Sequence, residues 1–226
     1  IAPKKLADES EAGAGYHRAI LLAKNDDGYK SILKISTIGQ LEGNRYHHNK
    51  PRIDRDTLKD NFKGLFVIPS FDGGDIQSAI KNNDLDRAKE YAQYYQDLWG
   101  EDFYVEITMH PELPGHDAEA ATVIKFCEEN KLQMVAGHDI YYLNPDDKKA
   151  RDVLVAIGGG KEVIMAEQDL DDLSFIGPAV MKERFKDIPE AIANTVKIAN
   201  QCHLTLELGQ WKFPQVETEE GKTHDE

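Results

Sequence analysis

The chain has few cysteines, a shortage of basic residues and no long apolar run. Its two cysteines, Cys127 and Cys202, are far apart in 226 residues, which excludes a disulfide framework and indicates a reducing compartment. No apolar run approaches the length that spans a membrane, and the opening residues lack the hydrophobic stretch of a signal peptide. We therefore expect a cytoplasmic protein that makes no contact with membranes.

The chain also has few basic residues relative to its acidic residues. Lysine and arginine number 27 against 41 acidic residues, for a net charge of -14. A surface of that sign does not hold a polyanion through its overall field, so any contact with nucleic acid is local or made by another part of the protein. The first residue is Ile1 rather than methionine, and we expect the chain to be part of a longer protein.

Several catalytic motifs are also missing. Glutamate follows Gly158-Gly159-Gly160-Lys161, and the upstream glycine of a phosphate-binding P-loop is absent, so the triple glycine is interpreted as a helix stop. The sequence has no Gly-x-Ser-x-Gly, no His-Glu-x-x-His and no cysteine spacing suited to zinc. These absences exclude the commonest nucleotide-binding, esterase and zinc-protease patterns.

Short apolar runs alternate with amphipathic stretches along most of the chain. Strands are predicted at residues 17–23, 65–69, 103–108, 133–138 and 204–208, and helices at 26–38, 84–99, 117–130 (capped by Asp117), 145–157 and from 189 onward. This order predicts parallel strands joined by helical crossovers and covered on both faces. The predicted class is α/β, and a barrel or a doubly wound sheet both fit.

Histidines and acids gather where predicted strands end. His17, His110 and the pair His138-Asp139 each adjoin a strand edge, where chemistry is found in β/α proteins. Imidazole and carboxylate together suit zinc, manganese or iron, although each side chain could instead have a hydrogen-bonded structural role. Because neighbours in a strand alternate in direction, a ligand pair from this strand would be Asp139 and residue 141, which is Tyr141.

Ordered motifs give these residues a family context. Residues 16–25, 28–29, 50–54, 102–106 and 138–143, followed by 151–154, 188–191, 194–195, 198–199 and Cys202, resemble the PHP (polymerase and histidinol phosphatase) domain of the bacterial replicative DNA polymerase III alpha subunit. The resemblance spans nearly the whole chain. It implies a distorted β/α barrel with fewer strands than a TIM barrel, at the N-terminal end of a large polymerase.

The same resemblance implies a domain that is incomplete at its N-terminus. The family's opening His-x-His element, the following Asp-His element and a glutamate have no counterpart here. Residues 1–211 then form the PHP domain, and residues 212–226 form an acidic linker toward the polymerase core. Five acids and one lysine in residues 216–226 agree with a linker. We expect the fragment on its own to be marginally stable, because a barrel without its first strands has open edges.

Family members with an intact site hold a metal cluster that supports proofreading exonuclease or phosphoesterase chemistry. The resemblance keeps His17 and Asp139 as ligands, but places Phe71 where a cysteine belongs and Tyr141 where a histidine belongs. Phenylalanine cannot bind a metal and neutral tyrosine rarely does, so we expect low metal occupancy. The remaining candidates for accessory ligands are His110 and His138.

Two functions follow as alternatives. In the first, the segment has an eroded metal site, no catalytic residue and no cofactor, and serves as a structural platform for the polymerase core and for a proofreading subunit and other replicase subunits. DNA and magnesium would then be bound by the parent polymerase. In the second, it is an active phosphoesterase or 3'-5' exonuclease that uses zinc or manganese at His17, His110, His138 and Asp139. A free-standing histidinol phosphatase is disfavoured by the polymerase-like residues 50–54.

Overall fold

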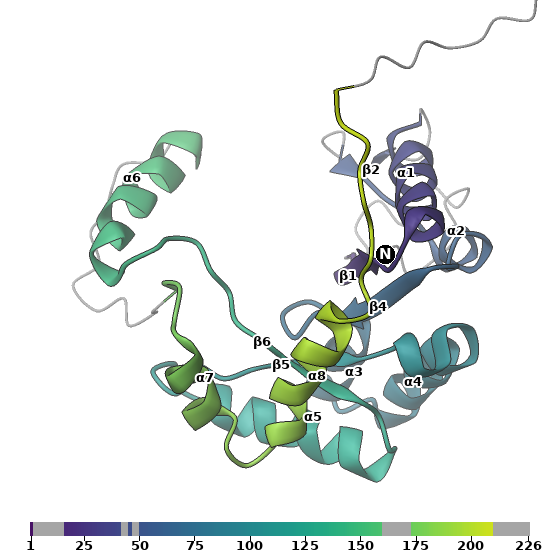
Figure 1. Cartoon of the computed structure of the whole chain (residues 1–226). Coiled ribbons are helices and arrows are strands. Elements are labelled where there is room, and N and C mark those ends of the chain that lie inside the picture. Colours follow the sequence, from purple (N-terminus) through teal and green to yellow (C-terminus); the bar gives the residue numbers. More distant parts are fainter. Residues whose placement is uncertain (2–15, 42–44, 47–49, 160–172, 210–226) are drawn as a thin grey trace, which may run out of the picture.

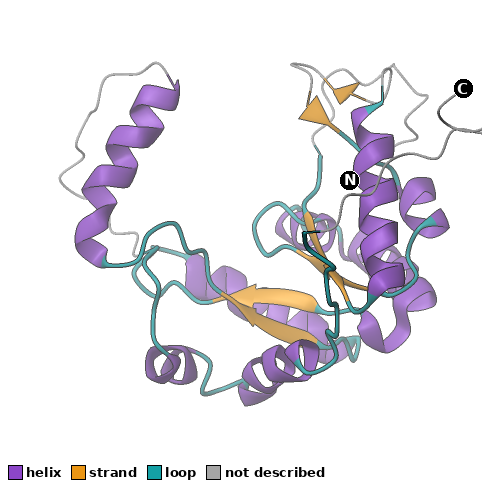
Figure 2. Ribbon diagram, turned by 45° about the horizontal axis from the view of Figure 1, so that its top comes forward, coloured by secondary structure: helices purple, strands orange, loops and turns teal. Residues whose placement is uncertain are grey.

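The computed structural model describes residues 1, 16–41, 45–46, 50–159 and 173–209. Its strands are β1 (Ala19–Ala23), β2 (Arg45–Tyr46), β3 (Lys50–Pro51), β4 (Leu65–Pro69), β5 (Val105–Thr108) and β6 (Met134–Gly137). Its helices are α1 (Asp26–Gln40), α2 (Arg55–Asp60), α3 (Asp75–Lys81), α4 (Leu85–Trp99), α5 (His116–Glu129), α6 (Lys148–Gly159), α7 (Pro178–Arg184) and α8 (Pro189–Ala199), with 3-10 turns η3 (Gly100–Asp102) and η4 (Pro145–Asp147). The mixed α/β class predicted from the sequence is confirmed (Figures 1 and 2).

Four of the predicted strands lie in a curved row. β1 pairs with β4, a bridge between Val67 and Phe103 connects β4 to the approach to β5, and β5 pairs with β6. The β5–β6 pair and the bridge are parallel, as predicted. The β1–β4 pair is antiparallel, so the prediction of an all-parallel arrangement is wrong for β1. A buried apolar run gives no sign of the direction of its strand, which is why the sequence pattern could not detect this.

Strand β4 and most of β5 are buried on both faces. Leu65, Val67, Val105 and Ile107 face a large core that includes residues of α3, α4 and α5. The alternate residues, among them Phe66, Ile68 and Val135, face a smaller core with Ile198 of α8. Strand pleating separates the two sets, and the two-sided burial agrees with the prediction of helices on both faces.

Most helix starts follow the capping rules. The side chains of Asn25, Asp54 and Asp84 accept hydrogen bonds from backbone N–H groups in the first turns of α1, α2 and α4, and Pro189 is at the start of α8. Asp117 is not the cap predicted for α5. The helix starts one residue earlier, at His116, after Gly115 in the left-handed conformation with φ 85°, a backbone geometry that glycine adopts without strain.

The other predicted elements are partly confirmed. The predicted helix at 145–157 is divided into the 3-10 turn η4 and α6. Residues 204–208 form no strand in the described chain. Just before them, the His203 N–H donates to the carbonyl of Lys24, the residue that follows β1, at 2.7 Å. Strand formation needs a partner ladder, and a short apolar pattern does not reveal whether one exists.

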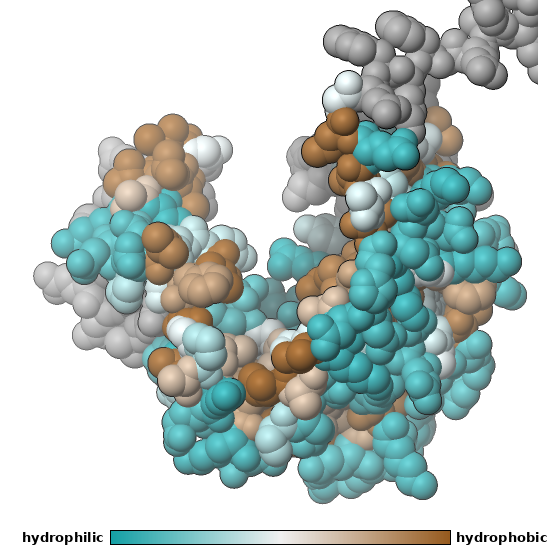
Figure 3. Space-filling model, viewed as in Figure 1, coloured by the Kyte–Doolittle hydropathy of each residue, from teal (hydrophilic) through white to brown (hydrophobic). Residues whose placement is uncertain are grey.

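Helix α6 stands apart from the packed body of the molecule (Figure 1). Its side chains Val153, Leu154, Val155 and Ile157 are exposed, and the space-filling view shows apolar surface on this arm (Figure 3). In the part of the chain that the structure describes, no helix combines the length and apolar content needed to cross a membrane. The described strands form two-stranded sheets rather than a closed barrel.

Candidate functional site

The predicted site residues meet at one edge of the strand row, which we call the rim. Phe71, His110 and His138 follow the ends of β4, β5 and β6, which run in one direction. His17 precedes β1, and because β1 is antiparallel to β4, its start lies at this same edge. The reversed strand therefore brings His17 to the rim, where a parallel strand would have placed it at the opposite end.

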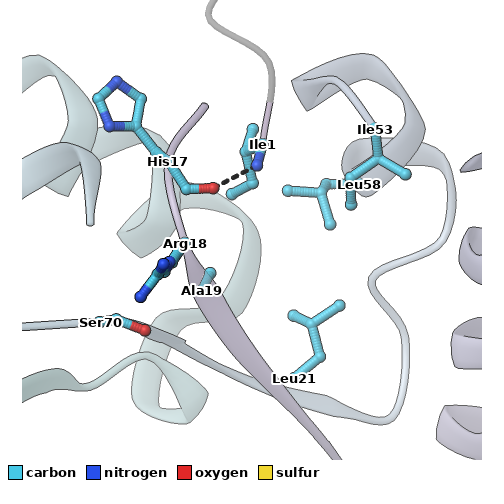
Figure 4. Close-up of a pocket in the computed structure, with 8 residues that line it drawn as sticks. All are labelled: Ile1, His17, Arg18, Ala19, Leu21, Ile53, Leu58 and Ser70. Atoms are coloured by element: carbon cyan, nitrogen blue, oxygen red, sulfur yellow. Dashed lines mark hydrogen bonds between the residues drawn. The ribbon is translucent and has the colours of Figure 1, made fainter. Parts of the chain in front are cut away.

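His17 is half-buried at the mouth of a pocket. The Ile1 amino group donates to the His17 carbonyl, and the pocket below has a volume of about 370 Å³ and is lined largely by Ile1, Ala19, Leu21, Ile53 and Leu58. The imidazole turns away from Leu58 and Leu21 (Figure 4). Burial lowers the pKa of His17, and the charge of Asp75 partly opposes this shift, so the ring is neutral near pH 7.

A buried polar network lies close to His17. Asp75 accepts hydrogen bonds from the Arg55 guanidinium at 2.8 Å and from the Tyr95 hydroxyl at 2.9 Å, and it is 1% exposed. The guanidinium also lies 4.1 Å from the centroid of the Tyr91 ring. Burial raises the pKa of Tyr95 well above its usual value, and the carboxylate of Asp75 adds to the shift. The network links α2, α3 and α4 through the side chains of Arg55, Asp75 and Tyr95.

Three imidazoles pack together at the ends of β5 and β6. The His110 ring stacks on His138, with centroids 5.0 Å apart and planes at 29°. It meets His116 edge-on at 5.1 Å. His110 is only 3% exposed, so it is a buried rim residue rather than a freely accessible ligand.

Polar contacts set the proton positions on these rings. His110 Nδ1 lies 3.1 Å from Glu112 Oε1, and the Glu112 carboxylate also lies 3.5 Å from Arg184. A carboxylate can only accept, so Nδ1 of His110 is the donor. His138 Nε2 likewise donates to the Ser174 carbonyl at 3.0 Å.

His116 is a rim residue that the sequence reasoning did not identify. Its Nδ1 accepts from the His110 N–H at 3.4 Å, which leaves the proton on Nε2, 3.2 Å from the Thr108 hydroxyl. Burial, followed by the charge of His110, lowers the pKa of His116. His116 is the first residue of helix α5 rather than the last residue of a strand. A search for histidines at the ends of predicted strands therefore does not find it.

Phe71 fills the space beside His116. Its ring lies 5.1 Å from the His116 ring at 34°, and its N–H donates to Glu106 Oε2 at 2.9 Å. The Glu106 side chain presses against Gly137, where an added Cβ would overlap it. Burial raises the pKa of Glu106, the Phe71 N–H opposes this shift, and the charge of Asp139 adds to it.

The pleat rule that paired Asp139 with position 141 does not apply at these residues. β6 ends at Gly137, so alternation does not continue through the next residues, and Asp139 and Tyr141 are both exposed. Tyr141 is 58% exposed and its ring lies 4.6 Å from the Arg151 guanidinium. Strand pleating was extended beyond the residues that have strand geometry.

The donors present do not fit a metal cluster. Across the described ranges, no three histidine, cysteine, aspartate or glutamate side chains are arranged to hold an ion. The imidazoles stack on one another and bind Glu112, Thr108 and a carbonyl, whereas a metal site requires several lone pairs that converge on one point. The low metal occupancy expected from the sequence stays a prediction.

Comparison with known proteins decides the family. Residues 5–110 match the PHP domain family. The chain carries a PHP domain. The DNA polymerase III subunit alpha of Borreliella burgdorferi is 33% identical over 202 residues, which cover 88% of this chain and 17% of that protein.

Two further relatives of this PHP-domain chain have the same name as the Borreliella burgdorferi protein. The DNA polymerase III subunit alpha of Neisseria meningitidis serogroup A is 32% identical over 213 residues, 92% of this chain and 18% of that protein. The Helicobacter pylori strain 26695 protein is 31% identical over 201 residues, 83% of this chain and 16% of that protein. The resemblance identified in the sequence is confirmed, and the chain spans less than a fifth of the length of these relatives.

Proposed function

We propose that this chain is the PHP part of a bacterial DNA polymerase III alpha subunit, a DNA-directed DNA polymerase that works in the cytoplasm. Relatives with this name cover about nine-tenths of the chain. Residues 1–211 would form the domain, and the acidic residues 212–226, which lie outside the described residues, would lead toward the polymerase core. Nucleotidyl transfer, magnesium and DNA would belong to that core.

Within such a polymerase the segment acts as a structural platform with an eroded metal site. The observation that carries this proposal is the packing of Phe71 against His116. An aromatic ring without a donor atom occupies the rim at the position where the family resemblance implies a cysteine ligand. Tyr141, at the position implied for a histidine, is turned to solvent.

The platform would pack on the polymerase core of the same chain and position a proofreading subunit and other replicase subunits. The curved row of β1, β4, β5 and β6 would be part of the wall of a distorted β/α barrel. Two observations support this inference: side chains on both faces of β4 are packed in hydrophobic cores, and β5 and β6 are parallel.

The alternative is a metal-dependent phosphoesterase or 3'-5' exonuclease that uses His17, Asp139, His110 and His138. Among the described residues, no three histidine, cysteine, aspartate or glutamate side chains are arranged to hold an ion, which disfavours this alternative. A hydrolysis assay separates the two functions: the chain is incubated with manganese or zinc and a single-stranded DNA or a phosphate monoester. We expect no hydrolysis above the level of the Asp139→Asn variant.

The matched control is Asp72→Asn, which removes an exposed rim carboxylate that pairs with Arg18. Metal-dependent hydrolysis that disappears in Asp139→Asn and His17→Ala but persists in Asp72→Asn would overturn the platform proposal. Equal background in all four proteins supports it.

A further inference from the structure

One segment crosses the rim from the end of β6 to the end of β5. We call residues 173–184 the strap. At its start it forms a short ribbon with the residues after β6: the Tyr141 N–H donates to the Leu173 carbonyl at 2.9 Å, and the Phe175 N–H donates to the Tyr142 carbonyl at 3.0 Å. The Leu173 N–H also donates to the Tyr142 hydroxyl at 3.0 Å.

The ribbon places the buried Ser174 against the histidine cluster. Its carbonyl accepts the hydrogen bond from His138 Nε2, and the residue is 3% exposed. The first end of the strap therefore touches one of the three packed imidazoles directly.

The other end of the strap is fixed by Arg184. One guanidinium nitrogen donates to the Met109 carbonyl at 2.8 Å, and another lies 3.5 Å from Glu112 Oε2. Glu112 in turn accepts from His110. The arginine side chain is 13% exposed, so this link is shielded from water and strengthened by that shielding.

Apolar packing contributes little between these two ends. Helix α7 has no buried residue, although Met181 packs partly against the core. Phe175 is 61% exposed, and a Cβ added at Gly177 would meet nothing within 4 Å. Beyond the strap, Phe185 and Ile188 are buried anchors. The middle of the strap is thus held in place mainly by its polar ends.

We propose that the strap closes the rim over the histidine cluster and that Arg184 is its latch. With the latch made, Glu112 is held on His110, and His110 is shut off from solvent. With the latch broken, the strap swings between its ribbon and the anchors at 185 and 188, and His110 becomes accessible. This device does not depend on whether the rim binds a metal or on which polymerase subunits the domain contacts.

The test is the rate of hydrogen–deuterium exchange at carbon 2 of each histidine ring, measured by mass spectrometry on the wild-type chain and on Arg184→Ala. Exchange at His110 should rise roughly tenfold or more, the factor expected when a charge-assisted hydrogen bond that closes a segment is lost. The exposed His203 gives an internal reference whose rate should not change.

Lys186→Ala is the matched control, because it removes a neighbouring cation whose ion pair with Glu183 is exposed. Should Arg184→Ala not fold, Glu112→Gln removes the charge that holds both Arg184 and His110, and it should still accelerate His110 exchange severalfold. The proposal is overturned by unchanged His110 exchange in a folded latch variant, or by equal acceleration in Lys186→Ala.

Discussion

At the scale of single residues, the best-defined feature is the burial of Asp75 with its two donors. The carboxylate is 1% exposed, while the side chain of Arg55 is 24% exposed. A charge left alone in such a position is strongly destabilising because no water replaces its partner. Asp75 and Arg55 therefore act as one unit that ties α2 to α3.

Removal of one member of this unit should be costly. We predict that Arg55→Met lowers the free energy of unfolding by about 2–4 kcal/mol, since it keeps much of the stem over Tyr91 but leaves the Asp75 charge buried and unpaired. Urea denaturation monitored by circular dichroism measures the change. Arg18→Met is the control: it breaks the exposed pair with Asp72 and should change stability by at most about 1 kcal/mol. Equal losses would show that burial of the pair is unimportant.

Individual rim residues were predictable to different degrees. His17, His110 and His138 were identified because each adjoins a strand, and all three lie at the rim. The substitutions at Phe71 and Tyr141 could be named only from the family resemblance. The contacts of Phe71 could not be foreseen, because they depend on His116, which reaches the rim from the start of a helix.

At the scale of elements, helix α5 has an unusual first residue. His116 is at the positive end of the helix dipole and is partly buried, and its lowered pKa reflects that burial and the neighbouring His110. The unfolded chain therefore binds a proton at this ring more readily than the folded chain does. Stability from this group is complete above the usual pKa of 6.5 and falls as the pH drops below it.

The lowered pKa of His116 gives a prediction for the pH dependence of stability. The free energy of unfolding should decrease between pH 7.5 and pH 5.5, and it should decrease less in His116→Gln, which cannot take up the proton. Urea denaturation of both proteins at the two pH values measures the difference, and His17, whose pKa is lowered in the same sense, contributes equally to both. An identical pH dependence would contradict the role assigned to His116.

Sequence periodicity predicted the positions of helices and strands better than it predicted how the strands pair. The helices at 26–38 and 84–99 and the strands at 65–69 and 103–108 were located to within a few residues, because their apolar spacing and capping residues are local signals. Strand direction, the missing ladder at 204–208 and the end of β6 at Gly137 depend on contacts between distant segments. No local pattern encodes those contacts.

At the scale of the whole molecule, the chain is an open row of strands with one detached arm. The row and its two cores account for the packed body, whereas α6 exposes its apolar side chains on the arm (Figures 1 and 3). Composition and alternation predicted the α/β class with helices on both faces. They did not distinguish a barrel from a sheet, since both bury the same alternating pattern.

We propose that this rim does not work as a metal centre. Metal analysis by mass spectrometry after incubation with zinc or manganese and gel filtration tests this proposal most directly. The variant Phe71→Cys/Tyr141→His restores the two donors that the family resemblance implies at the rim, and Leu33→Cys/Val196→His adds the same donors away from the rim as its control. We predict that the wild-type chain retains far less than one metal ion. Retention of one or more ions per chain, lost in His17→Ala/Asp139→Asn, would contradict this proposal.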